Sequence, residues 1–224
     1  FLSERNIMNM LRQVSLTAIC GFGLTMVILL GEIDLSVGSQ QAIAGLCSVV
    51  ALNATGSIVL AVLAALAAGV GVGALNGFLV AKGKMNSLIV TLGTMTIWRG
   101  VAMVTTDAVS IQVAYPDFQV LGTGYVGPIP NGVIIMAVLF VAIWYILRHT
   151  TFGRYIYAIG GNQEASKLAG LPVDRMRITV YIISGVLTML AGVLLASRMS
   201  SAQPTAGDGF EMTVIAAIIL GGVS

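Results

Sequence analysis

The sequence has few charged residues and almost no histidine or cysteine. Lys, Arg, Asp and Glu together make up 9% of the 224 residues, whereas soluble proteins carry about 25%. Hydrophobic residues make up 57%, and the formal net charge is only +2. This balance excludes a soluble domain, and the sequence has no basic patch of the kind that binds nucleic acid. We therefore expect an integral membrane protein in contact with lipid.

The same scarcity excludes several kinds of chemistry. His149 is the only histidine, so a metal site or a Ser/His/Asp set lacks the companions that it needs. Cys20 and Cys47 lie in apolar stretches without CxxC spacing, as small buried residues do. Neither GxGxxG nor a GxxxxGK motif occurs, so the sequence has no recognisable loop for nucleotide phosphates. We expect a non-enzymatic chain with no catalytic residue, metal, cofactor or ATPase site of its own.

Long apolar runs are abundant, and seven of them approach or reach the length of a helix that crosses a bilayer. We expect an all-α polytopic bundle that forms a single transmembrane domain over residues 1–224. The second run is short, which predicts a broken or tilted helix. The sequence starts without methionine and stops just after an apolar run, so we expect a piece of a longer protein. The seven predicted spans are 14–30, 37–52, 57–80, 87–106, 132–147, 178–196 and 212 onward.

Glycine is frequent, at 27 residues, and it recurs at every fourth position in the third predicted span. Gly69, Gly73 and Gly77 form a smooth ridge on one face of that helix. In a membrane, small residues with this spacing let two helix backbones approach each other closely. We expect the ridge to be a helix-packing surface.

Basic residues indicate which loops face the cytoplasm, because Lys and Arg are enriched in short cytoplasmic loops. Lys82 and Lys84 predict a cytoplasmic turn, and five of the eleven basic residues predict the same for segment 148–177. The loops 107–131 and 197–211 are then external. Each is either an ordinary connector or the host of a short re-entrant or interfacial element that meets an external partner.

Arginines also occur in two places that this orientation does not explain. Arg5 and Arg12, together with Glu4, fall on the external side, which we attribute to a preceding helix outside the sequence. Arg99 follows Trp98 inside the fourth span. An arginine within a span is a candidate functional residue, but near a helix end it also snorkels to the interface or pairs structurally. We favour these two roles for Arg99 over contact with a substrate.

Two carboxylates stand between the first two spans, in the stretch GEIDLSVGS. Charged groups near hydrocarbon are costly unless they face protein or water, so Glu32 and Asp34 are either pathway residues or members of a structural pair. Asp34 and Ser36 also carry the short side-chain oxygens that cap helix N-termini. We favour a helix start here, at the cytoplasmic end of the span, over direct contact with a substrate.

The most polar part of the chain is RHTTFGRYIYAIGGNQEASKLAGLPVDRMR, residues 148–177. Within it, Asn162 is a candidate helix N-cap, and Gly170 ends the helix in a left-handed conformation, with a proline two residues later. The short helix either lies on its own protein or docks in a groove of a partner. Its small apolar face consists of Ala165, Leu168 and Ala169.

This polar segment resembles the cytoplasmic coupling region of the permeases of bacterial ABC importers for ribose and related monosaccharides. GEIDLSVGS, VTLGTMTIWRG and AGDGFEMTVIAAIILGG resemble three further stretches of that family in the same order, so the likeness covers nearly the whole chain. Glu32 departs from the family pattern, which more often has glycine at that position. The glycine-rich C-terminal continuation of the family is also absent.

The resemblance implies a multi-pass permease subunit of a bacterial inner membrane that imports a monosaccharide or a similar small polar solute. It implies ATP and Mg²⁺ on a separate cytoplasmic ATP-binding subunit, a periplasmic or lipid-anchored sugar-binding protein, and a second permease copy or paralogue. Segment 148–177 then couples ATP hydrolysis to the helices. The expected docking residues are Gly160, Gly161, Asn162, Glu164, Ala165, Leu168 and Gly170.

Two other classes of function stay open. A secondary transporter driven by an ion gradient predicts inverted repeats and acidic sites within the spans, and the sequence has no clear repeat. A membrane scaffold or receptor subunit without transport predicts an assembled complex whose ATPase is not stimulated by substrate.

Overall fold

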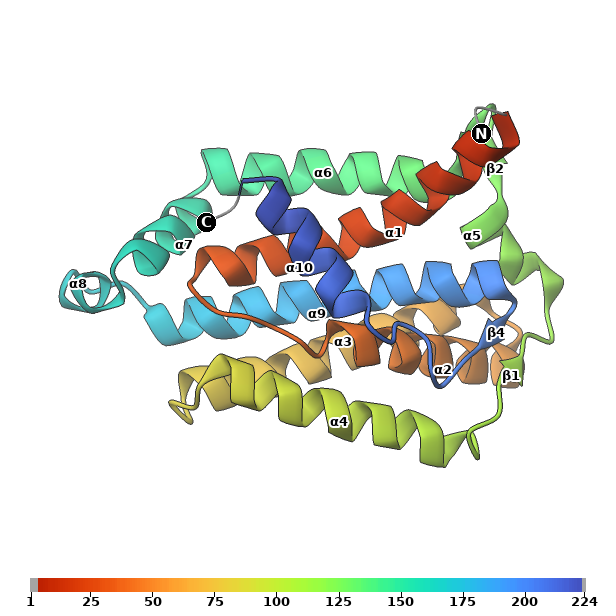
Figure 1. Ribbon diagram of the computed structural model, residues 1–224, viewed down its shortest axis with the longest axis horizontal. Coiled ribbons are helices and arrows are strands. Elements are labelled where there is room, and N and C mark those ends of the chain that lie inside the picture. The colour runs from red at the N-terminus through yellow and green to blue at the C-terminus, as the bar shows by residue number, and fades with distance from the viewer. Residues whose placement is uncertain (1–3, 223–224) are drawn as a thin grey trace.

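The chain folds into a bundle of helices, described here for residues 4–222 of a computed structural model (Figure 1). Strands are limited to two-residue segments in this part of the chain, so the expected all-α fold is confirmed. The helices are α1 (Glu4–Leu29), α2 (Val37–Thr55), α3 (Ile58–Ala81), α4 (Ser87–Thr105), α5 (Val120–Thr123), α6 (Asn131–His149), α7 (Thr151–Gly161), α8 (Gln163–Leu168), α9 (Val173–Met199) and α10 (Phe210–Leu220). The smaller elements are β1 (Ile111–Gln112), η1 (Pro116–Gln119), β2 (Tyr125–Val126), β3 (Ile129–Pro130) and β4 (Ser201–Ala202).

Each of the seven predicted spans corresponds to a helix. Five of these helices, α1, α3, α4, α6 and α9, contain a stretch that is long and apolar enough to cross a membrane. They run roughly along the long axis of the molecule, and α10 crosses them obliquely (Figure 1). The other two helices differ, because α2 begins with polar residues at 39–41 and α10 has 11 residues. Residues 223 and 224 of the seventh predicted span lie outside the described residues.

The glycine ridge of α3 lies directly against α9. A Cβ atom built at Gly73 would lie 2.7 Å from Cα of Ile182, and one at Gly77 would lie 2.8 Å from Cα of Ile178. Gly69 meets α9 in the same way, one turn further along. Ordinary contacts of a Cβ begin at 3.4 Å, so a larger residue at these positions would force the two backbones apart.

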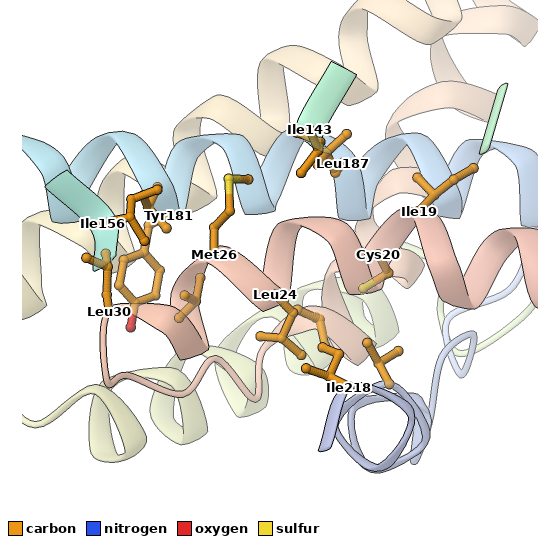
Figure 2. Close-up of a cluster of buried hydrophobic side chains, with 14 of the residues drawn as sticks. Ile19, Cys20, Leu24, Met26, Leu30, Ile143, Ile156, Tyr181, Leu187 and Ile218 are labelled. Carbon is orange, nitrogen blue, oxygen red and sulfur yellow. The ribbon is translucent and has the colours of Figure 1, made fainter. Parts of the chain in front are cut away.

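The main hydrophobic core forms where α1 packs on α9. Met26 of α1 and Leu30, directly after α1, lie in one buried cluster with Tyr181 of α9, and Ile156 of α7 joins them near the end of α1 (Figure 2). The hydroxyl of Tyr181 is directed towards the chain that leaves α1 (Figure 2). Segment 31–36, which follows α1 and which we call the linker, therefore runs beside the buried Tyr181 of α9.

The two ends of the bundle carry different structures. At one end, which we call the α8 end, α7 and α8 lie with the turn between α3 and α4, and a salt bridge of 3.1 Å joins Lys82 to Asp174. At the other end, which we call the strand end, β1 pairs antiparallel with β4, and β2 pairs with β3. The two loops expected on the external side therefore meet at one end. Loop 107–131 is more than a bare connector, because it holds short helical and strand elements.

Arg12 lies at the strand end, where its positive charge has two partners. Its Nη2 donates a hydrogen bond to the carbonyl oxygen of Thr123 at 2.5 Å, and its guanidinium lies 4.5 Å from the centre of the Tyr125 ring. A cation over an aromatic face is stabilised by the ring quadrupole. These two contacts give Arg12 a structural role at the end of the bundle that the sequence predicts to be external. The side chains of Glu4 and Arg5 lie outside the part of the chain that the structure describes.

Candidate functional site

The polar segment 148–177 holds two consecutive helices, of which the sequence predicted only the second. The first, α7, packs its buried residues Ile156 and Ile159 into the core near the end of α1. A Cβ atom at Gly160 would overlap the carbonyl oxygen of Leu29. Gly160, expected among the docking residues, therefore lets α7 approach α1 within the chain itself.

The second helix, α8, has a cap at each end. Oδ1 of Asn162 accepts a hydrogen bond from the backbone N–H of Ala165 at 2.9 Å. Glu164 lies in the first turn, where a negative charge favours the N-terminal end of a helix. Gly170 follows the helix with φ of +79°, a left-handed conformation that glycine adopts without strain. These caps hold a helix of six residues that is too short to be stable alone.

An apolar face of α8 is open to solvent. The side chain of Leu168 is 91% exposed, and Ala165, Ala169 and Gly161 are exposed as well. We call the surface formed by Ala165, Leu168 and Ala169 the α8 face. No other side chain among residues 4–222 covers the α8 face, so it is free to contact a partner.

Buried polar groups gather at the start of α2. Oδ1 of Asp34 accepts hydrogen bonds from the backbone N–H of Ser36 at 2.9 Å and from its hydroxyl at 2.6 Å. The hydroxyl oxygen of Ser36 in turn accepts from Nε2 of Gln40 at 2.8 Å and from Nδ2 of Asn76 at 2.9 Å. All four residues are at most 1% exposed. This polar cluster ties the linker to α2 and α3.

The polar cluster confirms the helix start expected at Asp34 and Ser36 but changes the role of Ser36. Ser36 does precede α2, but its side chain makes no capping hydrogen bond to the helix and is held by Asp34 instead. Asn76, the partner of Ser36, lies within α3 rather than at its end. Asp34 and Ser36 therefore lie at the start of α2, where the sequence predicted a helix start, but they are buried among side chains of α2 and α3. A charge at such a position needs protein partners, which the polar cluster provides.

The start of α10 meets the start of α2. A Cβ atom at Gly38 would overlap both the carbonyl oxygen of Gly207 and Oε2 of Glu211. Only glycine allows this approach, which brings the first turns of two helices together beside the polar cluster. The carboxylate of Glu211 lies close to the N-terminal turn of α2, where the helix dipole favours a negative charge.

Arg99 holds the loop that leads into α10. Its Nη1 donates hydrogen bonds to the carbonyl oxygens of Pro204 and Ala206 at 2.7 Å and 2.8 Å. Arg99 therefore makes structural contacts within the protein, which is one of the two roles that its sequence position favoured. Trp98, beside it, packs against a buried cluster of residues from α2, α3, α4 and α9.

Glu32 is buried in the linker, with 4% of its side chain exposed, and it forms an ion pair with Arg177 of α9. Its Oε1 lies 2.6 Å from Nε of Arg177. Burial raises the pKa of Glu32 above its ordinary value, and the positive charge of Arg177 opposes this rise. The structural pair that the sequence left open for Glu32 thus exists. Its partner was not predicted, because Arg177 counted only among the basic residues that set orientation.

Sequence reasoning also missed Gln40 and Asn76. A signal was present, because amides are costly inside an apolar helix unless they find a hydrogen-bond partner. What the sequence did not contain was the partner, since Ser36 joins both amides only after α2 and α3 pack together.

The fold defines a multi-pass membrane protein with a capped helix exposed at one end. The family described as the branched-chain amino acid transport system permease component matches residues 6–224. The chain belongs to this family and is a membrane permease.

Named relatives cover the whole chain. It is 45% identical to the ribose import permease protein of Haemophilus influenzae, over the full chain and 71% of that protein. It is 43% identical to the ribose import permease protein of Bacillus subtilis, over the full chain and 70% of that protein. It is 42% identical to the L-arabinose ABC transporter permease protein of Azospirillum brasilense, over the full chain and 66% of that protein. No solved structure matches the chain.

Proposed function

We propose that the chain is the translocating subunit of an ATP-driven importer of a monosaccharide. The observation that carries the proposal is the α8 face, an exposed apolar surface on a helix capped at both ends, at one end of a membrane-spanning bundle. The relatives support the substrate class, because their names specify ribose and L-arabinose, which are both pentoses. A pentose is therefore the first candidate, and branched-chain amino acids are the competing class because of the family description.

The proposal assigns a partner to each end of the bundle. An ATP-binding subunit covers the α8 face on the cytoplasmic side and binds ATP and Mg²⁺, so that hydrolysis takes place outside this chain. A sugar-binding protein, periplasmic or lipid-anchored, meets the loops of the strand end. A second copy of the permease, or a related one, completes the path in a bacterial inner membrane.

The contacts of α8 explain how a movement of the partner reaches the spans. The first residue of the capped helix α8, Gln163, is hydrogen-bonded to Arg177 of α9, so in this proposal α8 moves together with the start of α9. Because α9 touches α3 backbone to backbone along the glycine ridge, those two helices move together. Alternating access then requires two packed arrangements of the spans, which the binding of ATP on the partner favours in turn.

The test is transport by the assembled importer in proteoliposomes. Labelled ribose or L-arabinose is supplied outside with the sugar-binding protein, and ATP is supplied on the side of the ATP-binding subunit. We expect uptake that needs ATP, needs the binding protein, resists an uncoupler and is not competed by leucine. Uptake that follows a proton or sodium gradient without ATP would establish a secondary transporter instead. Loss of labelled sugar uptake to excess leucine would move the substrate to the amino acid class.

Substitution of the α8 face tests the docking surface itself. Leu168→Asp places a charge in the contact, so we expect the ATP-binding subunit to dissociate during purification and uptake to be lost. Glu164→Ala and Gly170→Val disturb the start and the end of the same helix, and we expect weaker coupling of uptake to hydrolysis. Val126→Asp is the matched control for assembly alone, because Val126 is an apolar residue 65% exposed at the strand end, away from the α8 face, and we expect the ATP-binding subunit to stay bound. Normal assembly and uptake with Leu168→Asp would refute docking at this face.

A further inference from the structure

We infer that the ion pair between Glu32 and Arg177 is a positioning device that connects α8 to the linker and so to the polar start of α2. The inference rests on the proposed function, because it concerns how a movement of α8 reaches the spans. Glu32 and Arg177 touch neither the substrate nor ATP in this account. They hold other elements at a defined separation.

On one side, Arg177 connects to α8. Its Nη2 donates a hydrogen bond to Oε1 of Gln163, the first residue of α8, at 3.0 Å. Among residues 4–222 this is the only side-chain hydrogen bond between α8 and a membrane-spanning helix. The same guanidinium contacts Glu32 through Nε, so one side chain joins α8 and the linker. The planar, rigid fork of arginine suits this role, because it fixes both contacts in one plane.

On the other side, the linker connects to three helices within a few residues of Glu32. The backbone N–H of Ile33 donates to Oγ of Ser87 at 3.4 Å, and Oγ1 of Thr91 donates to the carbonyl oxygen of Ile33 at 3.4 Å. Both partners belong to α4. Next along the chain, Asp34 holds Ser36 in the polar cluster with α2 and α3. A displacement of Glu32 therefore reaches the starts of α2 and α4 and the polar side chain of α3.

The surroundings of the pair give it room to move. Glu32 and Arg177 line one wall of a polar cavity of about 610 Å³ at the α8 end, together with Gln163 and Lys167 of α8. Arg177 is 17% exposed, whereas Glu32 is 4% exposed. A pair set between a polar cavity and the core can change its geometry without disturbing the hydrophobic packing around it.

The experiment separates positioning from simple stability. In the proteoliposome assay the measured quantity is the coupling ratio, defined as sugar molecules transported per ATP hydrolysed. Glu32→Gln and Arg177→Met each leave one charge of the pair without its opposite charge, so both are expected to lower thermal stability as well as the coupling ratio. The double variant removes both charges, so its thermal stability is expected to recover. Its coupling ratio is expected to stay lowered by about fivefold or more, within the usual range for coupling between sites.

Two further variants complete the design. Gln163→Leu cuts only the contact between Arg177 and α8, so we expect a lowered coupling ratio with unchanged thermal stability. The double variant Lys82→Met, Asp174→Asn is the matched control, because it removes an exposed ion pair at the same end of the bundle. We expect it to keep the wild-type coupling ratio.

The outcomes are distinct. A wild-type coupling ratio in the double variant of Glu32 and Arg177 would overturn the inference and leave the proposed function intact. A loss of coupling in the Lys82 and Asp174 control equal to that in the test variants would also overturn it. Absence of ATP-dependent sugar uptake in the wild-type importer would overturn the proposed function, and the inference with it.

Discussion

The contact between α3 and α9 can be tested with two glycines that lie two residues apart on the same helix. Gly73 faces α9, where a Cβ would lie 2.7 Å from Cα of Ile182 and would overlap the carbonyl oxygen of Tyr181. Gly71 faces outward, and a Cβ there meets nothing within 4 Å. Alanine at either position gains the same helix propensity over glycine, about 1 kcal/mol in a helix interior. The difference between the two variants therefore isolates the cost of the clash.

The size of that cost follows from the geometry. To bring the new Cβ of Gly73→Ala to an ordinary contact of 3.4 Å from Cα of Ile182, α3 and α9 must separate by about 0.7 Å, and the closer carbonyl oxygen of Tyr181 requires more. Overpacking of this kind costs about 1–3 kcal/mol. We expect Gly71→Ala to be neutral or slightly more stable than wild type, and Gly73→Ala to be less stable than Gly71→Ala by about 1–3 kcal/mol. Valine at the same two positions should widen the difference.

The assay is thermal unfolding of the purified permease in detergent, followed by the fraction that stays monodisperse after heating. For a chain of this size each kcal/mol corresponds to about 2–4 °C in Tm. Gly73→Ala should therefore melt several degrees below Gly71→Ala. Equal melting temperatures for the two variants would refute the backbone contact, since the gain in helix propensity is common to both.

Three further predictions concern other elements. Asn162→Ala removes the cap of α8, so we expect about 1 kcal/mol less helix stability and weaker retention of the ATP-binding subunit in co-purification, whereas Asn162→Asp should retain it. Arg99→Ala removes two hydrogen bonds to loop carbonyls, so we expect a loss of about 1.5–3 kcal/mol and faster proteolysis of loop 203–209. Unchanged proteolysis would contradict the role assigned to Arg99. Acidification should lower the coupling ratio, because protonation of Glu32 removes one charge of its ion pair. The raised pKa of Glu32 places this loss at a higher pH than for an ordinary glutamate. The coupling ratio of Glu32→Gln should not depend on pH in this way.

The parts of the structure that were predictable depend on neighbours in the sequence. Seven apolar segments predict seven helices because each segment satisfies its own backbone hydrogen bonds. The same holds for α8, whose cap Asn162 and terminator Gly170 lie within nine residues of one another and act through local geometry. The glycine ridge was visible as well, but its partner was not, since spacing on one helix says nothing about which helix it meets.

The parts that were missed depend on tertiary contacts. The sequence predicted a polar loop where α7 lies, because Arg154 and the surrounding threonines and tyrosines obscure its apolar pattern. Ile156 and Ile159 form a buried face only when α7 packs against the core near α1. The burial of Asp34 was missed for a related reason. Two carboxylates in GEIDLSVGS are typical of a helix end at a membrane surface, and only the packing of α2 against α3 places Asp34 inside the bundle.

The energetics of the Glu32–Arg177 pair favour a role beyond stability. Removing two charges from water is costly, and a buried ion pair is often no more stable than a well-packed apolar pair of similar size. A leucine and a methionine at these positions would hold α9 to the linker as firmly, but without direction, because apolar contacts tolerate sliding and rotation. The ion pair fixes the relative position and the relative orientation of the two side chains. It is continued by a directional hydrogen bond to Gln163 on one side and by the polar cluster on the other. Directional contacts that run from α8 to the polar cluster transmit a displacement of α8. An apolar contact of equal strength would absorb that displacement by sliding.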